Sequence, residues 1–126
     1  MKKVINTADA PAPIGPYNQA IVADKFIFVS GQIPLHPFTG ELVTDDITIA
    51  TNLVMENIGA ILNEAKAHFN DIVKTTIFLT DLADFAEVNE VYGTYFTDKH
   101  PARETVQVSA LPKGVSVEIS VIAVKS

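Results

Sequence analysis

The stretch Ile72-Val73-Lys74-Thr75-Thr76-Ile77-Phe78-Leu79-Thr80 is dominated by β-branched and apolar residues, which predicts a buried β-strand. A helix is expected after it, because apolar side chains recur there at helical spacing: Phe85, Val88, Tyr92, Tyr95 and Phe96. Another strand is predicted at about residues 103–109. A strand, a helix and a strand in this order favour a right-handed crossover between parallel strands, so region 72–109 predicts a mixed sheet.

The residues before this unit predict further strands and one long helix. Residues 17–23 and 26–30 favour two strands joined by a short turn, and residues 41–44 favour a short edge strand. The run Phe26-Ile27-Phe28-Val29 is apolar at every position, which predicts a central strand covered on both faces. Residues 47–67 carry one apolar stripe at helical spacing and predict the first helix.

Both predicted helices begin next to an aspartate. Asp46 is a suitable N-cap for the helix at 47–67, because its carboxylate can accept hydrogen bonds from free backbone N–H groups. Asp84-Phe85-Ala86-Glu87 resembles a capping box at the start of the second helix. With two amphipathic helices packed on one face of a mixed six-stranded sheet, the expected fold class is α/β (α+β).

The last two strands, at about 103–109 and 115–125, are predicted to form a hairpin through Leu111-Pro112-Lys113-Gly114. Polar and apolar residues alternate in both, so each strand has one polar face. The polar residues are Arg103, Thr105, Gln107 and Ser109 in one strand, and Ser116, Glu118 and Ser120 in the other. The sheet should therefore have an apolar side for the helices. Its polar side, with an arginine and a glutamate, should face solvent or another subunit.

Length and composition favour a single folded domain over residues 1–126. Apolar residues make up 48% of the chain, but no apolar stretch is long enough to cross a membrane or to predict a signal peptide. A cytoplasmic location is therefore expected. The absence of cysteine excludes disulfides and thiol chemistry. A net charge of −6, without a basic stripe, makes nucleic acid a poor default partner.

The sequence contains no glycine-rich phosphate loop and no GxSxG motif. His36, His68 and His100 lie too far apart for a local metal motif, and each is expected at the surface. Neither a metal, nor another cofactor, nor Ser/His/Asp chemistry is predicted. An arginine can bind a carboxylate through two parallel hydrogen bonds, and a glutamate can orient a water molecule. These residue types suit a small carboxylic acid that is hydrated at a neighbouring carbon, although a structural ion pair or a salt bridge between subunits would use them too.

Five motifs follow one another along nearly the whole chain. They are Pro-Ile-Gly-Pro-Tyr-Asn-Gln-Ala at 13–20, Val-Ser-Gly-Gln-Ile-Pro at 29–34, the region 73–81 with Phe85 to Tyr92, Pro-Ala-Arg at 101–103, and Leu-Pro-Lys-Gly at 111–114 with Val-Glu-Ile at 117–119. Through these motifs the chain resembles the YjgF/Rid family of reactive-intermediate deaminases, and its imine deaminase subgroup through Arg103. The chain departs from the usual motif at Asn18, where the family generally has serine.

The resemblance implies a chorismate-mutase-like fold and a homotrimer with three clefts between subunits. It also implies hydrolysis of 2-iminobutanoate and 2-iminopropanoate to 2-oxo acids and ammonia, without metal or cofactor. Two other functions stay open. One is a non-enzymatic trimer that binds small 2-oxo acids as a sensor or chaperone-like protein. The other is an RNA-cleaving translation inhibitor, which predicts a basic groove that an acidic chain does not favour.

The resemblance assigns catalytic roles to two residues. Arg103 would anchor the substrate carboxylate, and Glu118 would position the attacking water. Many relatives have cysteine, or serine followed by cysteine, directly after the arginine, where this chain has Glu104 and Thr105. The charge of Glu104, next to the anchor in sequence, could alter which substrate side chains are accepted.

The resemblance also implies binding roles for five residues. Tyr17 would form a cleft wall with a hydroxyl group. Ser30 and Gly31 would let the backbone approach the ligand, although a plain turn at a strand end would use the same residues. Thr105 would offer its amide or hydroxyl to the carboxylate, or serve only in the strand ladder. Asn89 would contact the substrate or make a structural hydrogen bond.

Overall fold

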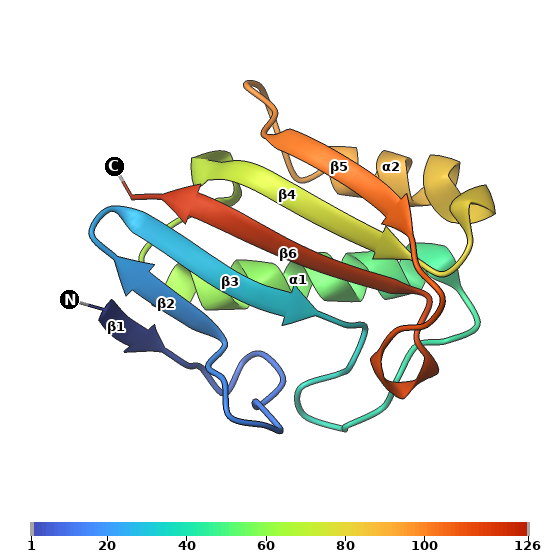
Figure 1. Cartoon of the computed structure of the whole chain (residues 1–126), viewed down its shortest axis with the longest axis horizontal. Helices are drawn as coiled ribbons and strands as arrows, with labels where there is room; N and C mark the ends of the chain where they lie inside the picture. Colours follow the sequence, from blue (N-terminus) through green and yellow to red (C-terminus); the bar gives the residue numbers. More distant parts are fainter. Residues whose placement is uncertain (1, 126) are drawn as a thin grey trace.

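The computed structural model describes residues 2–125, which form a six-stranded sheet with two α-helices on one face (Figure 1). The strands are β1 (Lys2–Ile5), β2 (Ala20–Ala23), β3 (Phe26–Gln32), β4 (Ile72–Leu79), β5 (Ala102–Gln107) and β6 (Val117–Val124). The helices are α1 (Ile47–Glu64) and α2 (Phe85–Gly93). In this part of the chain, no helix has the length and apolar character needed to cross a bilayer. The predicted mixed α/β architecture is confirmed.

The strand order is β1-β2-β3-β6-β4-β5. β4 and β5 are parallel, so the predicted parallel crossover through α2 is confirmed. β6 lies between β3 and β4 and is antiparallel to both. The predicted hairpin between the last two strands is therefore wrong, because β4 separates β5 from β6. Alternate residues of β6 are fully buried, and such a strand is best placed where neighbours pair with both of its edges.

The sixth strand of the sheet is β1, and not the edge strand predicted at residues 41–44. β1 pairs with β2 over all four of its residues and places Ile5 in the core. In residues 41–44, Leu42 makes only an isolated bridge to Leu35. The two lysines of β1 gave no strand signal in the sequence, but charged side chains are common on edge strands because they discourage pairing with other chains.

The first helix begins at its predicted cap and ends early. The Asp46 carboxylate accepts a hydrogen bond from the Ile49 N–H group at 3.0 Å, which confirms the N-cap. The helix was expected to reach residue 67 but ends at Glu64. Lys66 then takes a left-handed conformation, with φ at 62°, which helical backbone cannot include.

The capping box predicted at Asp84 is wrong. A 3-10 turn, Leu82–Asp84, runs directly into α2, so Asp84 has helical dihedral angles and its side chain makes no cap hydrogen bond. Asp81 caps the turn instead, because its carboxylate accepts a hydrogen bond from the Ala83 N–H group at 2.9 Å. The true start of the helical segment therefore lies three residues before the predicted one.

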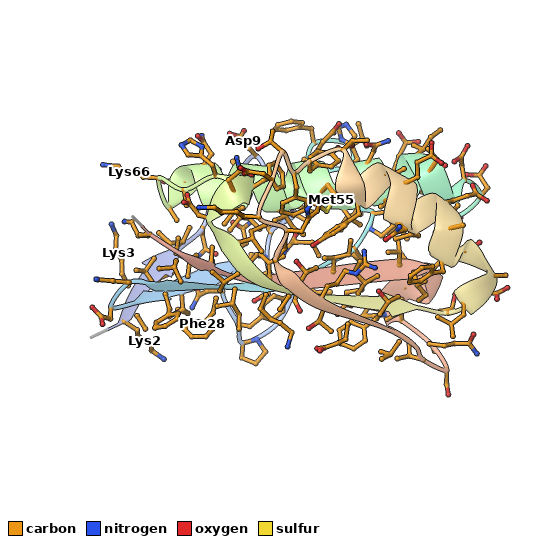
Figure 2. All side chains as sticks on the ribbon, turned by 90° about the horizontal axis from the view of Figure 1, so that it is seen from above. Lys2, Lys3, Asp9, Phe28, Met55 and Lys66 are labelled. Atoms are coloured by element: carbon orange, nitrogen blue, oxygen red, sulfur yellow. The ribbon has the colours of Figure 1, made fainter. Side chains whose placement is uncertain are left out.

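One face of the sheet is covered by the helices and the other is open. Figure 2 shows Met55 of α1 on the covered side and Phe28 of β3 on the opposite side. β3 is central, as predicted, but Phe26 and Phe28 are 45% and 44% exposed. The predicted cover on both faces of β3 is therefore wrong within residues 2–125. The open face carries large apolar side chains that this chain alone does not bury.

A buried glutamine fixes the segment that leads into β2. Gln19 is only 2% exposed, and its amide nitrogen donates to the backbone carbonyls of Thr7, Ala10 and Pro11. Its Oε1 accepts a hydrogen bond from the Thr7 N–H group at 2.7 Å. One side chain therefore holds residues 7–11 against the sheet.

We expect Gln19→Ala to lower the free energy of unfolding by about 2–3 kcal/mol, because it leaves several buried backbone groups without partners. Gln107 is the matched control: it is exposed and accepts one hydrogen bond, from the Leu82 N–H group. Gln107→Ala should cost less than about 1 kcal/mol. Urea denaturation at one fixed protein concentration measures both values. Equal losses in the two variants would contradict the role given to Gln19.

Candidate functional site

Arg103, the only arginine of the sequence, lies on the helix side of β5 beneath one stripe of α2. Its Nη1 donates a hydrogen bond to Asn89 Oδ1 at 2.7 Å. Its Cζ lies 5.6 Å from the centroid of the Phe85 ring and 5.2 Å from that of the Tyr92 ring. Among residues 2–125, no carboxylate forms an ion pair with this guanidinium. The side chain is therefore held in place while its charge stays available to a ligand.

Tyr92 fastens this arrangement to β4. Its hydroxyl donates to Thr75 Oγ1 at 2.8 Å, and both side chains are buried. Burial raises the pKa of Tyr92, while the hydrogen bond to Thr75 and the charge of Arg103 act in the opposite direction. His100, exposed as predicted, and Pro101 complete the rim of an open hollow around Arg103. Arg103 therefore gives the hollow a positively charged side, and the hydrogen bond to Thr75 holds the lining residue Tyr92 in place.

Thr105 lies two residues along β5, on the same side as Arg103. Its hydroxyl oxygen is buried and has no hydrogen-bond partner within the described chain. A buried polar atom without a partner costs about 1–3 kcal/mol. The structure thus brings Arg103 and Asn89 into direct contact, whereas Thr105 lies on the same face of β5 but outside the lining of the hollow.

Glu104 points to the open face of the sheet, away from the Arg103 guanidinium. Its Oε1 lies 3.2 Å from Lys74 Nζ, and its Oε2 accepts a hydrogen bond from the Thr76 hydroxyl at 3.0 Å. The hydrogen bonds from Thr76 and Lys74 lower the pKa of Glu104. The expectation that this charge acts beside the anchor is therefore not met within the chain, because neighbours in a strand point to opposite faces.

Glu118 lies on the open face against a bulge in β3. The pairing of β3 with β6 shifts between Val29 and Gln32, so Ser30 and Gly31 together oppose a single residue. A Cβ atom added to Gly31 would collide with Glu118 Oε2 and lie 2.9 Å from Glu118 Cδ. A side chain at this position would require the Glu118 carboxylate to move aside, because the carboxylate lies close to the Gly31 backbone.

Partial burial makes the Glu118 carboxyl group a weaker acid than an exposed glutamate. Burial raises its pKa above the usual range of a glutamate. A carboxylate with a raised pKa is a stronger proton acceptor once it is ionised. The Glu118 carboxylate is therefore able to accept a proton from a bound water once it is ionised.

Ser30 has a structural role in the chain. Its hydroxyl donates to the Asn18 carbonyl at 2.6 Å, and its N–H group donates to the Gln19 carbonyl at 2.9 Å. These bonds fasten β3 to the segment before β2. The Ser30 hydroxyl is therefore already committed as a donor.

Tyr17 and Gly31 border the same small hollow. Its other walls are mostly apolar and include Ile14, Ile33 and Leu35. The Tyr17 ring is 49% exposed, which fits a wall better than a core position. Because Gly31 also contacts Glu118, this hollow adjoins the carboxylate.

The predicted site residues form two groups on opposite faces of the sheet. Arg103 pairs with Thr75 of β4, whereas Glu118 pairs with Phe78. Thr75 and Phe78 are three positions apart in one strand, so their side chains point to opposite faces, as do those of their partners. The prediction that Arg103 and Glu118 share a polar face is therefore wrong. The groups are Arg103, Asn89 and Thr105 on one side, and Glu118, Tyr17, Ser30 and Gly31 on the other.

Known proteins similar to this chain match it over nearly its whole length. The family described as "Endoribonuclease L-PSP" matches residues 7–125. A 2-iminobutanoate/2-iminopropanoate deaminase of Mus musculus is 48% identical over 125 residues, which cover 99% of this chain and 93% of the mouse protein. The chain belongs to the YjgF/Rid family.

Other relatives in the family carry other names. A RutC family protein of Pyrococcus abyssi is 57% identical, with 98% of each chain covered. The crystal structure of E. coli TdcF with bound serine matches with a TM-score of 0.94 at 46% identity, and covers 98% of this chain and 99% of that one. Membership of the Rid family thus establishes the fold and indicates an enzyme, while the names of the relatives differ.

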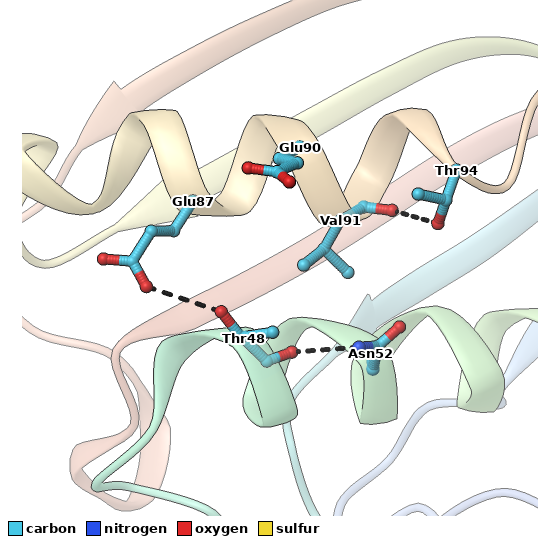
Figure 3. A pocket seen from close by; sticks show the side chains of 6 residues that line it. All are labelled: Thr48, Asn52, Glu87, Glu90, Val91 and Thr94. Carbon is cyan, nitrogen blue, oxygen red and sulfur yellow. Dashed lines mark hydrogen bonds between the residues drawn. The ribbon is translucent and has the colours of Figure 1, made fainter.

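A third hollow of this Rid-family chain lies between α1 and α2 (Figure 3). Its walls are Thr48, Asn52, Glu87, Glu90, Val91 and Thr94. The Thr48 hydroxyl donates to Glu87 Oε2 at 3.4 Å. None of these six residues is cationic, and two are acidic, so a carboxylate ligand would be repelled. The hollow around Arg103 is therefore the better candidate site.

The sequence-based prediction missed the two aromatic residues that contact Arg103. Phe85 and Tyr92 were assigned only to the apolar face of the second helix. Asn89 lies on the same helical stripe, four residues after one and three before the other. Asn89 lies between two aromatic residues on this stripe, and a polar residue at such a position indicates that the stripe contacts a polar side chain. In this Rid-family chain that side chain is Arg103.

We expect Gly31→Ala to lower the free energy of unfolding by about 1 kcal/mol, because the new methyl group forces the Glu118 carboxylate to move. In a Glu118→Ala background the same change should cost less than about 0.5 kcal/mol. Gly93→Ala is the matched control, since a Cβ there meets no atom within 4 Å. Denaturant unfolding of the four Gly31/Glu118 variants gives the coupling. Additive effects would show that the contact between Gly31 and Glu118 carries no energy.

Proposed function

We propose that this Rid-family chain hydrolyses small 2-imino acids, such as 2-iminobutanoate and 2-iminopropanoate, to 2-oxo acids and ammonia. One observation carries the proposal: Arg103 is held by Asn89 and two aromatic rings, and has no acidic partner in the described chain. Such a guanidinium can bind a carboxylate through two parallel hydrogen bonds. The name of the mouse relative, 2-iminobutanoate/2-iminopropanoate deaminase, supports the same activity here.

The proposed active unit is a homotrimer in which each site lies between two subunits. The Arg103 group and the Glu118 group lie on opposite faces of one sheet, so a single chain does not combine them. The open face also exposes Phe26, Phe28 and Val106, and apolar surface of this kind favours subunit packing. The Arg103 group of one subunit would meet the Glu118 group of the next.

In the proposed reaction the substrate carboxylate binds the Arg103 guanidinium in the hollow that this residue lines. Glu118 holds a water molecule and accepts its proton as the water oxygen attacks the iminium carbon. Glu118 returns this proton to the nitrogen of the resulting carbinolamine, and the C–N bond then breaks with release of ammonia. The hydroxyl group gives its proton to Glu118, which passes it to solvent, and its oxygen becomes the carbonyl oxygen of the 2-oxo acid. Free imines hydrolyse without catalysis, so positioning and modest charge stabilisation are sufficient.

Small carboxylic ligands are favoured over nucleic acid. TdcF of E. coli has serine bound, a small molecule with a carboxylate. The family description refers to an endoribonuclease, but the net charge of this chain is −6, and most nucleic-acid affinity comes from neutralising phosphates. A non-enzymatic sensor of 2-oxo acids would use the same Arg103, and turnover distinguishes it from an enzyme.

The first test is turnover of 2-iminobutanoate generated in solution and trapped with semicarbazide. We expect wild-type protein at catalytic concentration to suppress semicarbazone formation. Arg103→Ala should lower the catalytic efficiency by about 100-fold, because a charge-assisted pair of hydrogen bonds is lost. Lys25→Ala, at the exposed turn between β2 and β3, removes one positive charge elsewhere and should be active.

Two other outcomes of this assay would decide against the enzyme. Wild-type protein that binds 2-oxobutanoate but does not suppress the signal would support the sensor function. Cleavage of RNA by the wild type, undiminished in Arg103→Ala, would support a ribonuclease with a different site.

The composite site predicts complementation between two inactive variants. We expect Arg103→Ala and Glu118→Gln each to be nearly inactive, and co-expressed subunits to regain activity. Random mixing in equal amounts would restore about a quarter of the clefts, because each cleft takes one group from each of two neighbours. Activity of the mixture no higher than that of the two variants measured separately would contradict a site shared between subunits.

A further inference from the structure

Phe85 has a position that core packing does not explain. Its side chain is 40% exposed, although it is a large apolar residue at the start of α2. Its ring has the Arg103 guanidinium over it, at 5.6 Å. Phe85 and Tyr92 are seven positions apart, which corresponds to about 10 Å along a helix. The guanidinium bridges that gap, because it lies over both rings.

The faces and the edges of a guanidinium bind different partners. All five N–H donors of arginine point outward in the plane of the group, and its faces have none. An aromatic ring on a face attracts the positive charge without using a donor. Phe85 and Tyr92 therefore attract the charge without occupying an N–H donor, and the one hydrogen bond of the group, to Asn89, leaves other donors for a ligand.

The remaining contacts of the stripe complete the restraint. Asn89 Oδ1 accepts one hydrogen bond from Nη1, which limits rotation of the group within its plane. The hydroxyl of Tyr92 is bonded to Thr75 in β4, so that ring is itself fixed. Phe85 has no polar anchor and is the more exposed of the two rings. Its contact with Arg103 is the part of the restraint that substitution can remove with the least effect on folding.

We propose that Phe85 is a positioning residue for Arg103: its ring, together with that of Tyr92, fixes the plane of the guanidinium so that a free N–H edge selects a planar carboxylate over a neutral carbonyl group. This role rests on the proposed function, in which Arg103 anchors the substrate carboxylate. In this role Phe85, acting through Arg103, makes the site bind 2-oxo or 2-imino acids more tightly than their uncharged amides.

The contact itself can be tested without any assumption about function. Because Arg103 is the only arginine, ¹⁵N-arginine labelling gives one guanidinium Nε–H signal per subunit. A ring over the group shields its protons, so we expect an upfield-shifted Nε–H signal in the assembled wild-type protein. Phe85→Leu should move the signal toward the ordinary arginine position, and Phe85→Tyr, which keeps the ring, should not. An unchanged signal in Phe85→Leu overturns the positioning role.

The functional consequence is tested by ligand binding. Calorimetry would compare 2-oxobutanoate with the neutral 2-oxobutanamide. We expect Phe85→Leu to weaken binding of the acid about 3- to 10-fold, the range of a cation–π contact, and to leave binding of the amide unchanged. Phe85→Tyr should bind both ligands like the wild type. In an Arg103→Gln background, Phe85→Leu should have no further effect on the acid.

The outcomes separate this role from the proposed function. Equal weakening of acid and amide by Phe85→Leu would mean that the ring contacts the ligand directly, and overturns the positioning role. Wild-type protein that binds no 2-oxobutanoate and hydrolyses no 2-iminobutanoate would overturn the proposed function, and with it the selection of carboxylates. A ring-dependent NMR signal in that case would still establish the contact between Phe85 and Arg103.

Discussion

The parallel pairing of β4 with β5 is the constraint on which the candidate site depends. Parallel neighbours cannot be joined by a tight turn, so the chain must cross over the sheet, and α2 is that crossover. The crossover places one stripe of α2 over the inner side of β5, where Arg103 projects. The same pairing puts Thr75 beside Arg103, within reach of Tyr92. One topological requirement, the parallel crossover, therefore places Arg103, the two aromatic rings and Thr75 together.

The sheet also divides the chemistry of the molecule. The Arg103 guanidinium lies on the side that the helices cover, and the half-buried Glu118 carboxylate lies on the open side. Burial raises the pKa of Glu118. Placed side by side, the two groups would form an ion pair and neutralise each other. Their separation keeps the guanidinium free to bind an acid and the carboxylate free to accept a proton. In the proposed trimer, assembly of subunits would then place one group of each kind at the same ligand.

Much of the fold was predictable from local patterns. The β-branched run at 72–80, the apolar stripe of the first helix and the Asp46 cap each depend on neighbouring residues, and each is confirmed. The position of β6 was not predictable in this way, because it depends on which distant edges are free. The prediction of the sheet face on which Arg103 lies was wrong for a related reason. Alternation shows that residues of a strand share a side, but it does not show which side the helices cover. The pattern predicts that the polar residues of β5 face away from α2, whereas Arg103 contacts Asn89 and two aromatic rings of that helix.

The place of β6 affects how the protein is made. β6 comes after every other strand in the sequence, yet it lies between β3 and β4 and joins the two parts of the sheet. During synthesis, β1 to β3 and the β4–β5 pair emerge from the ribosome with unpaired edges, and neither part can find its neighbour until Val117–Val124 is translated. Contacts so distant in sequence form slowly, and open strand edges on a nascent chain are prone to aggregation. The sheet is therefore completed only after translation of its last strand, and the facing edges of β3 and β4 stay unpaired until then.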